Sequence, residues 1–183
     1  MSVLVLCTGN ICRSPMAEVM LAHRLAGRGV PVELSSAGFV TEDRPAPQEV
    51  LDVLSARGLD ASAHRSRRLA AVDLERPDLV LCMERRHVRE VAVLDRDAFA
   101  RTFTLPDLAR RVEAGGPRRP DEGVRAYLAR VSAGRRPTDV LGVDAADEVA
   151  DPYGRSASAY RRAADEIDHL LDVIVPHLFP LRS

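Results

Sequence analysis

A cysteine and an arginine near the N-terminus have the types and the spacing that phosphoryl chemistry requires. Cys7 follows the apolar run 3–6, and Arg13 stands six residues later, where a helical pattern begins at Pro15. The backbone N–H groups of a loop that opens a helix converge on one point, and the helix dipole adds positive potential there. A guanidinium group can bind two phosphate oxygens at once. The segment therefore has the parts of an anion-binding loop that holds a phosphate against a sulfur nucleophile.

The residues around the cysteine suit a tightly folded loop. Gly9 permits backbone conformations that a side chain forbids, and Asn10 tolerates the left-handed region. The hydroxyl of Ser14 can donate to the sulfur of Cys7, and a helix N-terminus beside a cation favours the thiolate. The alternative is a structural cysteine, because most cysteines are small buried residues. The agreement of strand, loop and helix signals favours a nucleophile that attacks phosphorus.

The composition is typical of one globular domain in a reducing compartment. The chain has 183 residues, 46% of them hydrophobic, and a formal net charge of −1. This charge gives no general attraction to nucleic acid or to a membrane, and no early apolar run is long enough for a signal peptide or a membrane span. Three cysteines make no disulfide framework. We therefore expect a single cytoplasmic domain over residues 1–183.

Strand and helix patterns alternate along the chain. Apolar runs predict strands at residues 2–7, 32–36, 79–83 and 101–105, and helical periodicity predicts helices at residues 15–28, 47–57, 69–74, 84–94 and 156–177. Alternating elements favour a parallel sheet covered on both faces, and ligands of such sheets bind beyond the carboxyl ends of the strands. The sequence therefore predicts an α/β fold of three layers, α/β/α, with the phosphate loop between the first strand and the first helix.

Five segments together resemble the low-molecular-weight protein tyrosine phosphatase family. The run VLVLCTGNICRSPMAE at residues 3–18 is similar to the signature of that family, and Ser-Ser-Ala-Gly at residues 35–38 is similar to its second-strand motif. Residues 58–67, residues 78–84 and the Asp-Pro-Tyr of residues 151–153 resemble its later motifs, in the same order. The resemblance implies a four-stranded parallel sheet of order 2-1-3-4.

The resemblance also implies a two-step reaction through a phosphocysteine. Cys7 is then the nucleophile, and Asp151 is the general acid and base, although Asp-Pro alone is a common turn element. Arg13 and the loop amides stabilise the transferred phosphoryl group, with the loop formed by Thr8, Gly9, Asn10, Ile11 and Cys12. We expect no cofactor and no metal, because no His, Cys and Asp cluster has the spacing of metal ligands.

Further residues resemble the support of that loop and the walls around it. The residues that resemble the bracing hydrogen-bond network of the family are Asn10, Ser14, Ser36 and His64. Ser36 and His64 also suit an ordinary strand end and a packed or exposed histidine. Cys12 can form a reversible disulfide with the nucleophile in relatives, or it can be a packing residue. The residues that we expect to line the substrate are Ile11, Phe39 and Tyr153.

Several other functions compete with hydrolysis of phosphotyrosine. Protein-arginine phosphatases resemble the segment 151–156, but they typically carry Thr where this chain has Ile11. Arsenate reductases of the same fold need further cysteines, whereas Cys82 stands alone. A phosphate-binding module without activity is disfavoured, because Cys7, Arg13 and Asp151 are all intact. The branched Ile11 favours an aromatic ester, so we predict a phosphotyrosine phosphatase.

Residues 110–148 depart from the family pattern and form a predicted insertion. Residues 110–136 hold eight arginines and three acidic residues, an excess of five positive charges, and helical spacing relates Val124, Tyr127, Leu128 and Val131. The first interpretation is a solvated insertion with one helix packed on the body. The second is a lid or docking surface for acidic phosphoproteins. As partners we expect phosphorylated protein substrates and neither nucleic acid nor membrane, with the protein a monomer or weak dimer.

Overall fold

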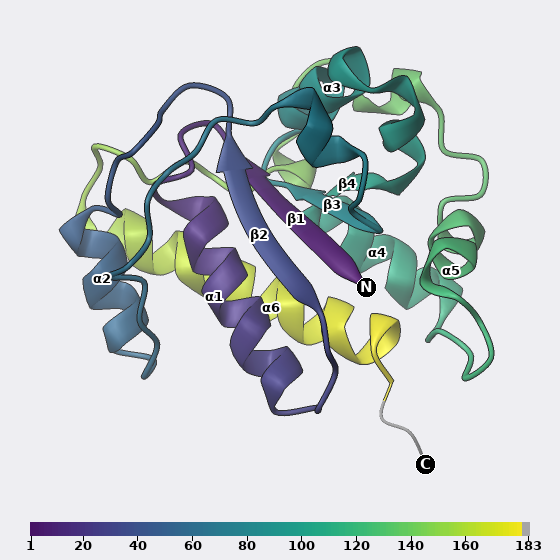
Figure 1. The fold of residues 1–183 in the computed structure, drawn as a ribbon, viewed down its shortest axis with the longest axis horizontal. Coiled ribbons are helices and arrows are strands. Elements are labelled where there is room, and N and C mark those ends of the chain that lie inside the picture. The colour runs from purple at the N-terminus through teal and green to yellow at the C-terminus, as the bar shows by residue number, and fades with distance from the viewer. Residues whose placement is uncertain (181–183) are drawn as a thin grey trace.

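Four parallel strands form one sheet at the centre of the molecule (Figure 1). The computed structural model of the chain describes residues 1–180. The strands are β1 (Ser2–Cys7), β2 (Glu33–Gly38), β3 (Leu79–Cys82) and β4 (Thr102–Thr104). They are arranged in the order β2-β1-β3-β4, and every neighbouring pair is parallel. The predicted α/β fold and strand order are therefore confirmed.

Side chains of β1 alternate between two hydrophobic cores. Val3, Val5 and Cys7 belong to one core, and Leu4 and Leu6 belong to the other. Successive side chains of a strand point to opposite faces of a sheet, so a strand with both faces covered needs apolar residues at every position. This requirement explains why the N-terminal strand is an unbroken apolar run rather than an alternating one.

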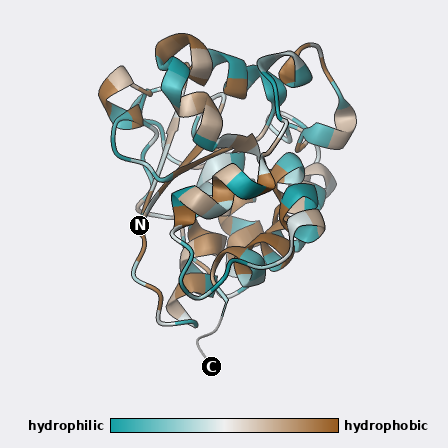
Figure 2. Ribbon diagram, turned by 90° about the vertical axis from the view of Figure 1, so that its right-hand side faces the viewer, coloured by the Kyte–Doolittle hydropathy of each residue, from teal (hydrophilic) through white to brown (hydrophobic). Residues whose placement is uncertain are grey.

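Helices cover both faces of the sheet and make the three layers. The face of Val3 and Val5 packs against α1 (Arg13–Ala26), α2 (Gln48–Ser55), α4 (Leu105–Gly115) and α6 (Ala157–Leu178). The opposite face packs against α3 (Arg85–Leu94) and the short turns η1 (Ala71–Leu74) and η2 (Arg96–Arg101). Figure 2 shows apolar strands between helices whose outer surfaces are largely hydrophilic. No helix within residues 1–180 combines the length and the hydropathy needed to cross a membrane.

Two helix boundaries differ from the sequence prediction in ways that affect the site. The first helix begins at Arg13 rather than Pro15, so Pro15 lies within the first turn, where its missing N–H has no intrahelical partner in any case. Helix α4 begins within residues 101–105, which the sequence pattern predicts as a strand, and the pattern predicts no helix after them. Its start is fixed by the hydroxyl of Thr104, which accepts from the backbone N–H of Asp107 at 3.2 Å.

Residues 110–148 contain a packed helix, as the spacing of their apolar residues predicts. Helix α5 (Val124–Val131) buries Tyr127, Leu128 and Val131 against the core that contains α4 and α6. Two short turns, η3 (Pro137–Val140) and η4 (Ala145–Asp147), follow before the Asp-Pro-Tyr segment. Residues 110–148 thus complete one side of the molecule beyond β4 (Figure 1).

Candidate active site

The loop between β1 and α1 presents free backbone donors at the carboxyl end of the sheet. None of the backbone N–H groups of residues 9–12 donates a hydrogen bond to another residue within residues 1–180. Asn10 has a φ of 51°, in the left-handed region that Asn tolerates. The loop leads directly into α1, whose N-terminus carries the positive end of the helix dipole. The arrangement can bind an anion through several N–H groups at once.

The sulfur of Cys7 lies at the base of this loop. Cys7 is the last residue of β1 and is 2% exposed. Its Sγ lies 3.0 Å from the Oγ of Ser14, in the first turn of α1. A hydroxyl at this distance can donate to a thiolate and stabilise the negative charge on sulfur. The sulfur and the unengaged N–H groups therefore belong to one short segment of backbone.

A fully buried asparagine ties the loop to three other segments. The Nδ2 of Asn10 donates to the Oγ of Ser14 at 2.9 Å and to the Oγ of Ser36 at 2.8 Å. Its Oδ1 accepts from the backbone N–H of Arg67 at 3.0 Å, and its carbonyl oxygen lies 2.6 Å from the Nε2 of His64. Every polar atom of the Asn10 side chain is therefore satisfied, which holds the left-handed residue in place.

The end of β2 fits against the loop without room for a side chain. A Cβ atom added at Gly38 would lie 2.7 Å from the backbone nitrogen of Asn10 and 2.9 Å from the carbonyl oxygen of Thr8. The next residue, Phe39, donates its backbone N–H to that same Thr8 oxygen at 2.8 Å. The glycine of the Ser-Ser-Ala-Gly segment thus allows the second strand to support the loop directly.

Arg13 is buried and held by two carboxylates. Its Nη1 donates to Glu84 Oε1 at 2.6 Å and to the carbonyl oxygen of Val149 at 2.9 Å. Its Nη2 donates to Asp151 Oδ2 at 2.7 Å, and the Oγ1 of Thr8 lies 3.5 Å away. The arginine is 1% exposed, so its charge needs these partners. Through Arg13, the structure brings together the loop and the Asp-Pro-Tyr segment, which lie more than 130 residues apart in sequence.

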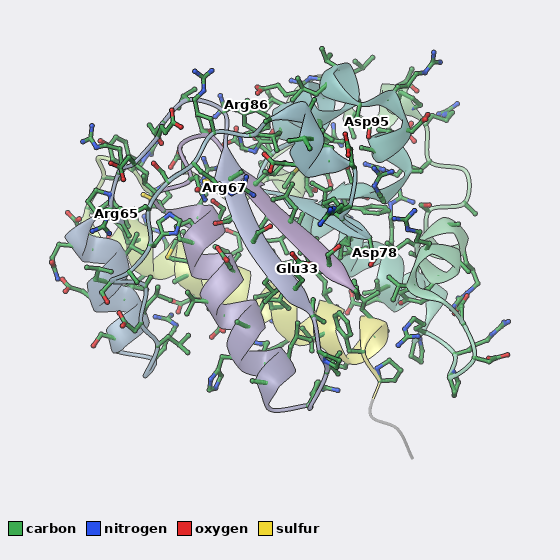
Figure 3. The ribbon with its side chains drawn as sticks, in the orientation of Figure 1. Glu33, Arg65, Arg67, Asp78, Arg86 and Asp95 are labelled. Carbon is green, nitrogen blue, oxygen red and sulfur yellow. The ribbon has the colours of Figure 1, made fainter. Side chains whose placement is uncertain are left out.

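Glu84 stays ionised because two arginines outweigh its burial. Burial raises the pKa of this carboxyl, but hydrogen bonds from Arg86 and the charge of Arg13 lower it to about 2. Arg86 Nε donates to Glu84 Oε2 at 2.6 Å, and Arg86 Nη2 donates to the Oγ1 of Thr8 at 2.6 Å. Figure 3 places Arg67 and Arg86 toward the carboxyl end of β2, and Glu33 toward its opposite end. The loop therefore lies at an arginine-rich end of the sheet.

A buried, neutral histidine lies beside Thr8 of the loop. His87 is fully buried, and burial lowers its pKa to about 3, with the charges of Arg13 and Arg86 acting in the same direction. Its Nε2 lies 3.1 Å from the Oγ1 of Thr8. Its ring stacks on the ring of Phe39, with centroids 5.4 Å apart and planes 12° apart. The aromatic side chain after β2 is thereby fixed in orientation.

The three predicted substrate-lining residues occupy different surroundings. Ile11 is partly buried and packs on the core, and Phe39 is partly buried against His87. Tyr153 is 60% exposed, and its backbone N–H donates to Asp151 Oδ1 at 3.1 Å. The tyrosine side chain is therefore free to contact a substrate, while its backbone orients the carboxylate.

The remaining cysteines are buried thiols. Burial, together with the charge of Cys7, raises the pKa of Cys12 to about 12. Burial also raises the pKa of Cys82, which lies in β3. Cys7, Cys12 and Cys82 are all free. Within residues 1–180, no three His, Cys, Asp or Glu side chains are grouped in a way that could hold a metal ion.

Four residues of this site were missed by sequence reasoning. Three of them, Glu84, Arg86 and His87, follow β3, and Thr41 donates its hydroxyl to the carbonyl oxygen of Gly9. The position at the carboxyl end of a strand beside β1 was a usable signal for Glu84 and its neighbours, because ligand sites gather there. Nothing in the local sequence pointed to Thr41.

Fold and site together define an α/β protein with an anion-binding loop at the carboxyl end of a parallel sheet. The model of the family described as low molecular weight phosphotyrosine protein phosphatase matches residues 2–132. The chain is 34% identical over 119 residues to the low molecular weight protein-tyrosine-phosphatase Etp of Escherichia coli (strain K12), covering 64% of this chain and 78% of that protein. It is 31% identical over 178 residues to a protein-arginine-phosphatase of Geobacillus stearothermophilus, covering 96% and 95%.

A solved structure supports the same conclusion at the level of the fold. The low molecular weight protein tyrosine phosphatase from T. tengcongensis is 30% identical, has a TM-score of 0.71, and covers 96% of this chain and 97% of its own. The chain therefore belongs to the low-molecular-weight phosphotyrosine protein phosphatase family, and it is a phosphatase of that family. Its relatives include both tyrosine phosphatases and arginine phosphatases.

Proposed function

We propose that this phosphatase hydrolyses phosphotyrosine in proteins, with Cys7 as nucleophile and Asp151 as general acid and base. The observation that carries the proposal is the position of Arg13, whose Nη2 is 2.7 Å from Asp151 Oδ2 and which follows directly on the loop that begins after Cys7. A nucleophile, an anion-binding guanidinium and a proton donor therefore meet at one end of the sheet. Free cysteines suit the reducing cytoplasm in which we expect the enzyme to act.

The first step transfers the phosphoryl group to sulfur. The Cys7 thiolate attacks phosphorus, so an S–P bond forms while the P–O bond to the tyrosine breaks. The proton of the Asp151 carboxyl goes to the leaving phenolate oxygen. The free N–H groups of residues 9–12 and the guanidinium of Arg13 stabilise the charge on the equatorial oxygens.

The second step releases phosphate and restores the enzyme. Asp151, now ionised, accepts a proton from a water molecule whose oxygen attacks phosphorus. A P–O bond forms, the S–P bond breaks, and Cys7 leaves as a thiolate. Ser14 Oγ, at 3.0 Å from the sulfur, favours that departure because it can donate to the negative charge.

The pair between Arg13 and Asp151 supports a link between substrate binding and proton donation. Arg13 Nη2 donates to Asp151 Oδ2, whereas the Nη1 side is held by Glu84 and Val149. A phosphate dianion on the loop competes for Nη2, and the displaced Asp151 then stands beside a dianion. Substrate binding would therefore release Asp151 from Arg13 for proton transfer.

Phosphotyrosine is favoured by the apolar side chains beside the loop. Ile11 packs on the core, and Phe39 is held flat against His87. These groups suit an aromatic ring, while Arg86 donates to Thr8 at the loop and repels a substrate guanidinium. In this proposal, the exposed ring of Tyr153 also contacts the aromatic ring of the substrate.

Phosphoarginine is the second candidate substrate. It is favoured by the 31% identity to the arginine phosphatase of Geobacillus stearothermophilus over almost the whole chain, and by the absence of tryptophan from the sequence. The same nucleophile and acid would cleave a P–N bond. The phosphotyrosine and phosphoarginine proposals differ in what they require of the side chain at position 11.

A parallel assay on phosphotyrosine and phosphoarginine peptides of matched sequence tests the proposal. We expect a higher kcat/KM for phosphotyrosine in the natural protein, and a shift toward phosphoarginine in Ile11→Thr, because the smaller polar side chain admits a guanidinium. Ile11→Val, which stays apolar, is the matched control. A higher kcat/KM for phosphoarginine in the natural protein would establish the second candidate instead.

A further inference from the structure

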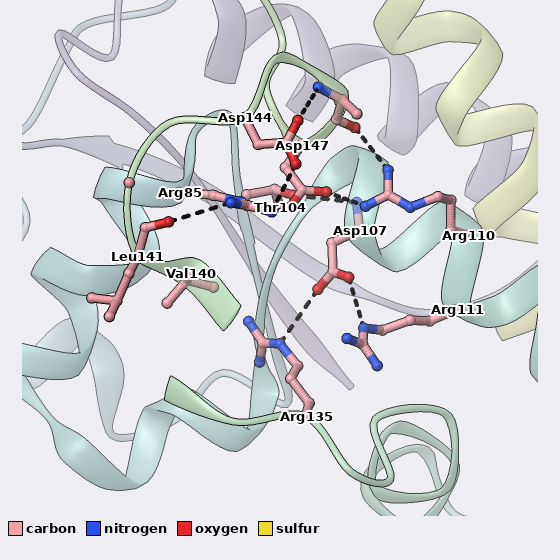
Figure 4. Close-up of polar contacts among 12 residues, drawn as sticks. Arg85, Thr104, Asp107, Arg110, Arg111, Arg135, Val140, Leu141, Asp144 and Asp147 are labelled. Carbon is pink, nitrogen blue, oxygen red and sulfur yellow. Dashed lines mark hydrogen bonds and ion pairs between the residues drawn. The ribbon is translucent and has the colours of Figure 1, made fainter. Parts of the chain in front are cut away.

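A second basic site lies on the far side of β4 from β1. A cavity of about 530 Å³ opens between α4, α5 and the turns η3 and η4 (Figure 4). Its basic lining residues are Arg85, Arg110, Arg111, Arg130 and Arg135. Its acidic lining residues are Asp107, Asp139 and Asp147. The volume lies within the range of about 300–1,000 Å³ typical of sites for small ligands. Two of the lining arginines also pair with carboxylates outside the lining, Arg85 with Asp144 and Arg130 with Glu122.

The arginines of this cavity share their carboxylates in pairs. Asp107 accepts from Arg111 Nε at 2.7 Å and faces Arg135 Nε at 3.3 Å. Asp147 is shared in the same way by Arg85 and Arg110, and Arg85 also faces Asp144 at 3.1 Å. Figure 4 shows the guanidinium groups of Arg85, Arg110, Arg111 and Arg135 beside these carboxylates. Asp107 therefore leaves about one positive charge on Arg111 and Arg135, whereas Asp144 and Asp147 balance Arg85 and Arg110.

Arg111 supplies donors that the protein itself does not use. Its two terminal amino groups donate no hydrogen bond within residues 1–180, and its side chain is 24% exposed. The neighbouring Arg135 is rigid, because its guanidinium lies 4.3 Å from the ring of Phe99 and 4.5 Å from that of Phe103. Burial lowers the pKa of Arg135, and the nearby charge of Arg111 lowers it further. Added negative charge at this point is therefore favoured.

We propose that this cavity binds a small polyanion that carries two or more phosphate groups. The anion would bridge the free amino groups of Arg111 to Arg110, whose only carboxylate partner within residues 1–180 is Asp147. None of the lining residues belongs to the phosphate loop, so this site is separate from the one that contains Cys7. The inference does not depend on whether the enzyme prefers phosphotyrosine or phosphoarginine.

The cavity is connected to the segment of the general acid. Asp147 is 6% exposed and is held by Arg110 and Arg85 four residues before Asp151. Between the two aspartates, Val149 donates its N–H to the carbonyl oxygen of Met83 and accepts from Arg13. An anion that competes with Asp147 for Arg110 therefore acts on the backbone that positions Asp151. Binding in the cavity should change kcat.

Calorimetric titration with tripolyphosphate tests the proposal, because this probe needs no turnover. The two sites are separated by Arg13→Ala, which disables the loop, and by Arg111→Gln, which disables the cavity. We expect Arg13→Ala to retain one binding event. We expect Arg111→Gln to bind at that site at least about tenfold more weakly, the equivalent of one charge-assisted contact.

Two further variants control for net charge. Arg119→Gln makes the same charge change at an exposed position outside the cavity, and it should bind within about twofold of the natural protein. Asp139→Asn removes a carboxylate from the cavity wall and should strengthen binding by several-fold. This variant keeps the test valid if Arg111→Gln does not fold.

Other outcomes would overturn the proposal. If Arg13→Ala abolishes all binding, tripolyphosphate binds only at the phosphate loop. If Arg119→Gln weakens binding as much as Arg111→Gln does, the interaction is with general surface charge. If Asp139→Asn leaves the affinity unchanged, the ligand does not enter the cavity.

Discussion

The phosphate loop and the arginine-lined cavity use the same two side-chain types but differ in the donors that remain free. At the loop, one arginine is held by two carboxylates, since Arg13 binds both Glu84 and Asp151. In the cavity, Arg111 and Arg135 share the carboxylate of Asp107, and the terminal amino groups of Arg111 donate no hydrogen bond within residues 1–180. The loop arginine is therefore neutralised before an anion arrives, whereas Arg111 keeps free donors.

The difference has consequences for binding. Arg13 is 1% exposed, and a buried charge is costly without partners, so its carboxylates hold it in one orientation. Arg111 is 24% exposed, and its terminal amino groups are free. An anion at the loop must displace Asp151 from Arg13, whereas an anion in the cavity meets free donors on Arg111 and competes with Asp147 only for Arg110. We expect chemistry at the first site and binding without chemistry at the second.

The largest predicted effect is a loss of activity that occurs at the phosphate loop and not at the cavity. Cys7→Ser should reduce turnover of an aryl phosphate by more than about a thousandfold, because a serine hydroxyl is not ionised at neutral pH. Arg111→Gln should change the same rate by less than about threefold without added polyanion. The measurement is kcat for both variants in one assay. Retention of more than a few percent of activity by Cys7→Ser would refute the assigned nucleophile.

The second prediction contrasts the two carboxylates of residues 147–151. Asp151→Asn should lower kcat by about a hundredfold or more for phenyl phosphate, and less for esters of acidic phenols that leave without a proton. Asp147→Asn should lower kcat by a similar factor for every ester, because it positions the segment and donates no proton. The measurement is kcat across a series of leaving groups. A constant loss for Asp151→Asn would exclude it as the general acid.

The third prediction compares two glycines in close contact with their surroundings. Gly38→Ala places a methyl group against the loop backbone and should cost about 1–3 kcal/mol of stability and about tenfold in kcat/KM. Gly115→Ala, beside the cavity, meets the side chain of Val131, which can move. Its stability should change by less than about 1 kcal/mol, with activity retained. Thermal unfolding and kinetics on both variants provide the check, and equal losses of activity would remove the special role of Gly38.

The last prediction concerns the pH dependence of stability at the two regions, which leaves activity at neutral pH aside. His87 has a folded pKa of about 3, below the ordinary value of 6.5, so its neutral form stabilises the fold above pH 6.5. This contribution is lost as the pH falls from 6.5 toward 3, by at most about 1.4 kcal/mol per pH unit. Burial raises the pKa of Asp147, but the hydrogen bonds and charges of Arg110 and Arg85 lower it below its ordinary value. The stability that Asp147 contributes is therefore lost only below about pH 4.

Denaturant unfolding from pH 7 to pH 4.5 measures this difference. His87→Gln should flatten the decline of the unfolding free energy in that range, whereas Asp147→Asn should leave the slope unchanged. An identical slope for the natural protein and His87→Gln would show that the histidine is not held neutral.

The sequence was informative where local chemistry determines local structure. The apolar run of β1, the glycine and asparagine of the loop and the amphipathic α6 identified the fold, and resemblance gave the strand order 2-1-3-4, which the structure confirms. Helix α4 could not be predicted from the sequence, because its start depends on a side-chain cap from Thr104 at the end of a three-residue strand. Such a short strand carries too little periodicity to mark its own end.

The partners of Arg13 and the cavity could not be found by the same means. Glu84 and Asp151 meet one guanidinium from segments 67 residues apart, and only the fold brings them together. The excess of arginine in residues 110–136 was visible, but the pairing of Arg110 with Asp147 and Arg85 depends on the path of η4 past α3. Side-chain type alone did not distinguish a solvated surface from a lined cavity.

The ion pair between Arg13 and Asp151 sets a rule for inhibitor design. A compound that fills the loop must carry enough negative charge to replace the carboxylate on Nη2. Neutral phosphate mimics, and monoanions such as simple carboxylic acids, would not displace Asp151 from Arg13. The Asp151 carboxylate would then still occupy part of the anion site. Difluorophosphonates, which remain doubly charged and cannot be hydrolysed, should therefore outperform them by a wider margin here than ring size or hydrophobic fit would suggest.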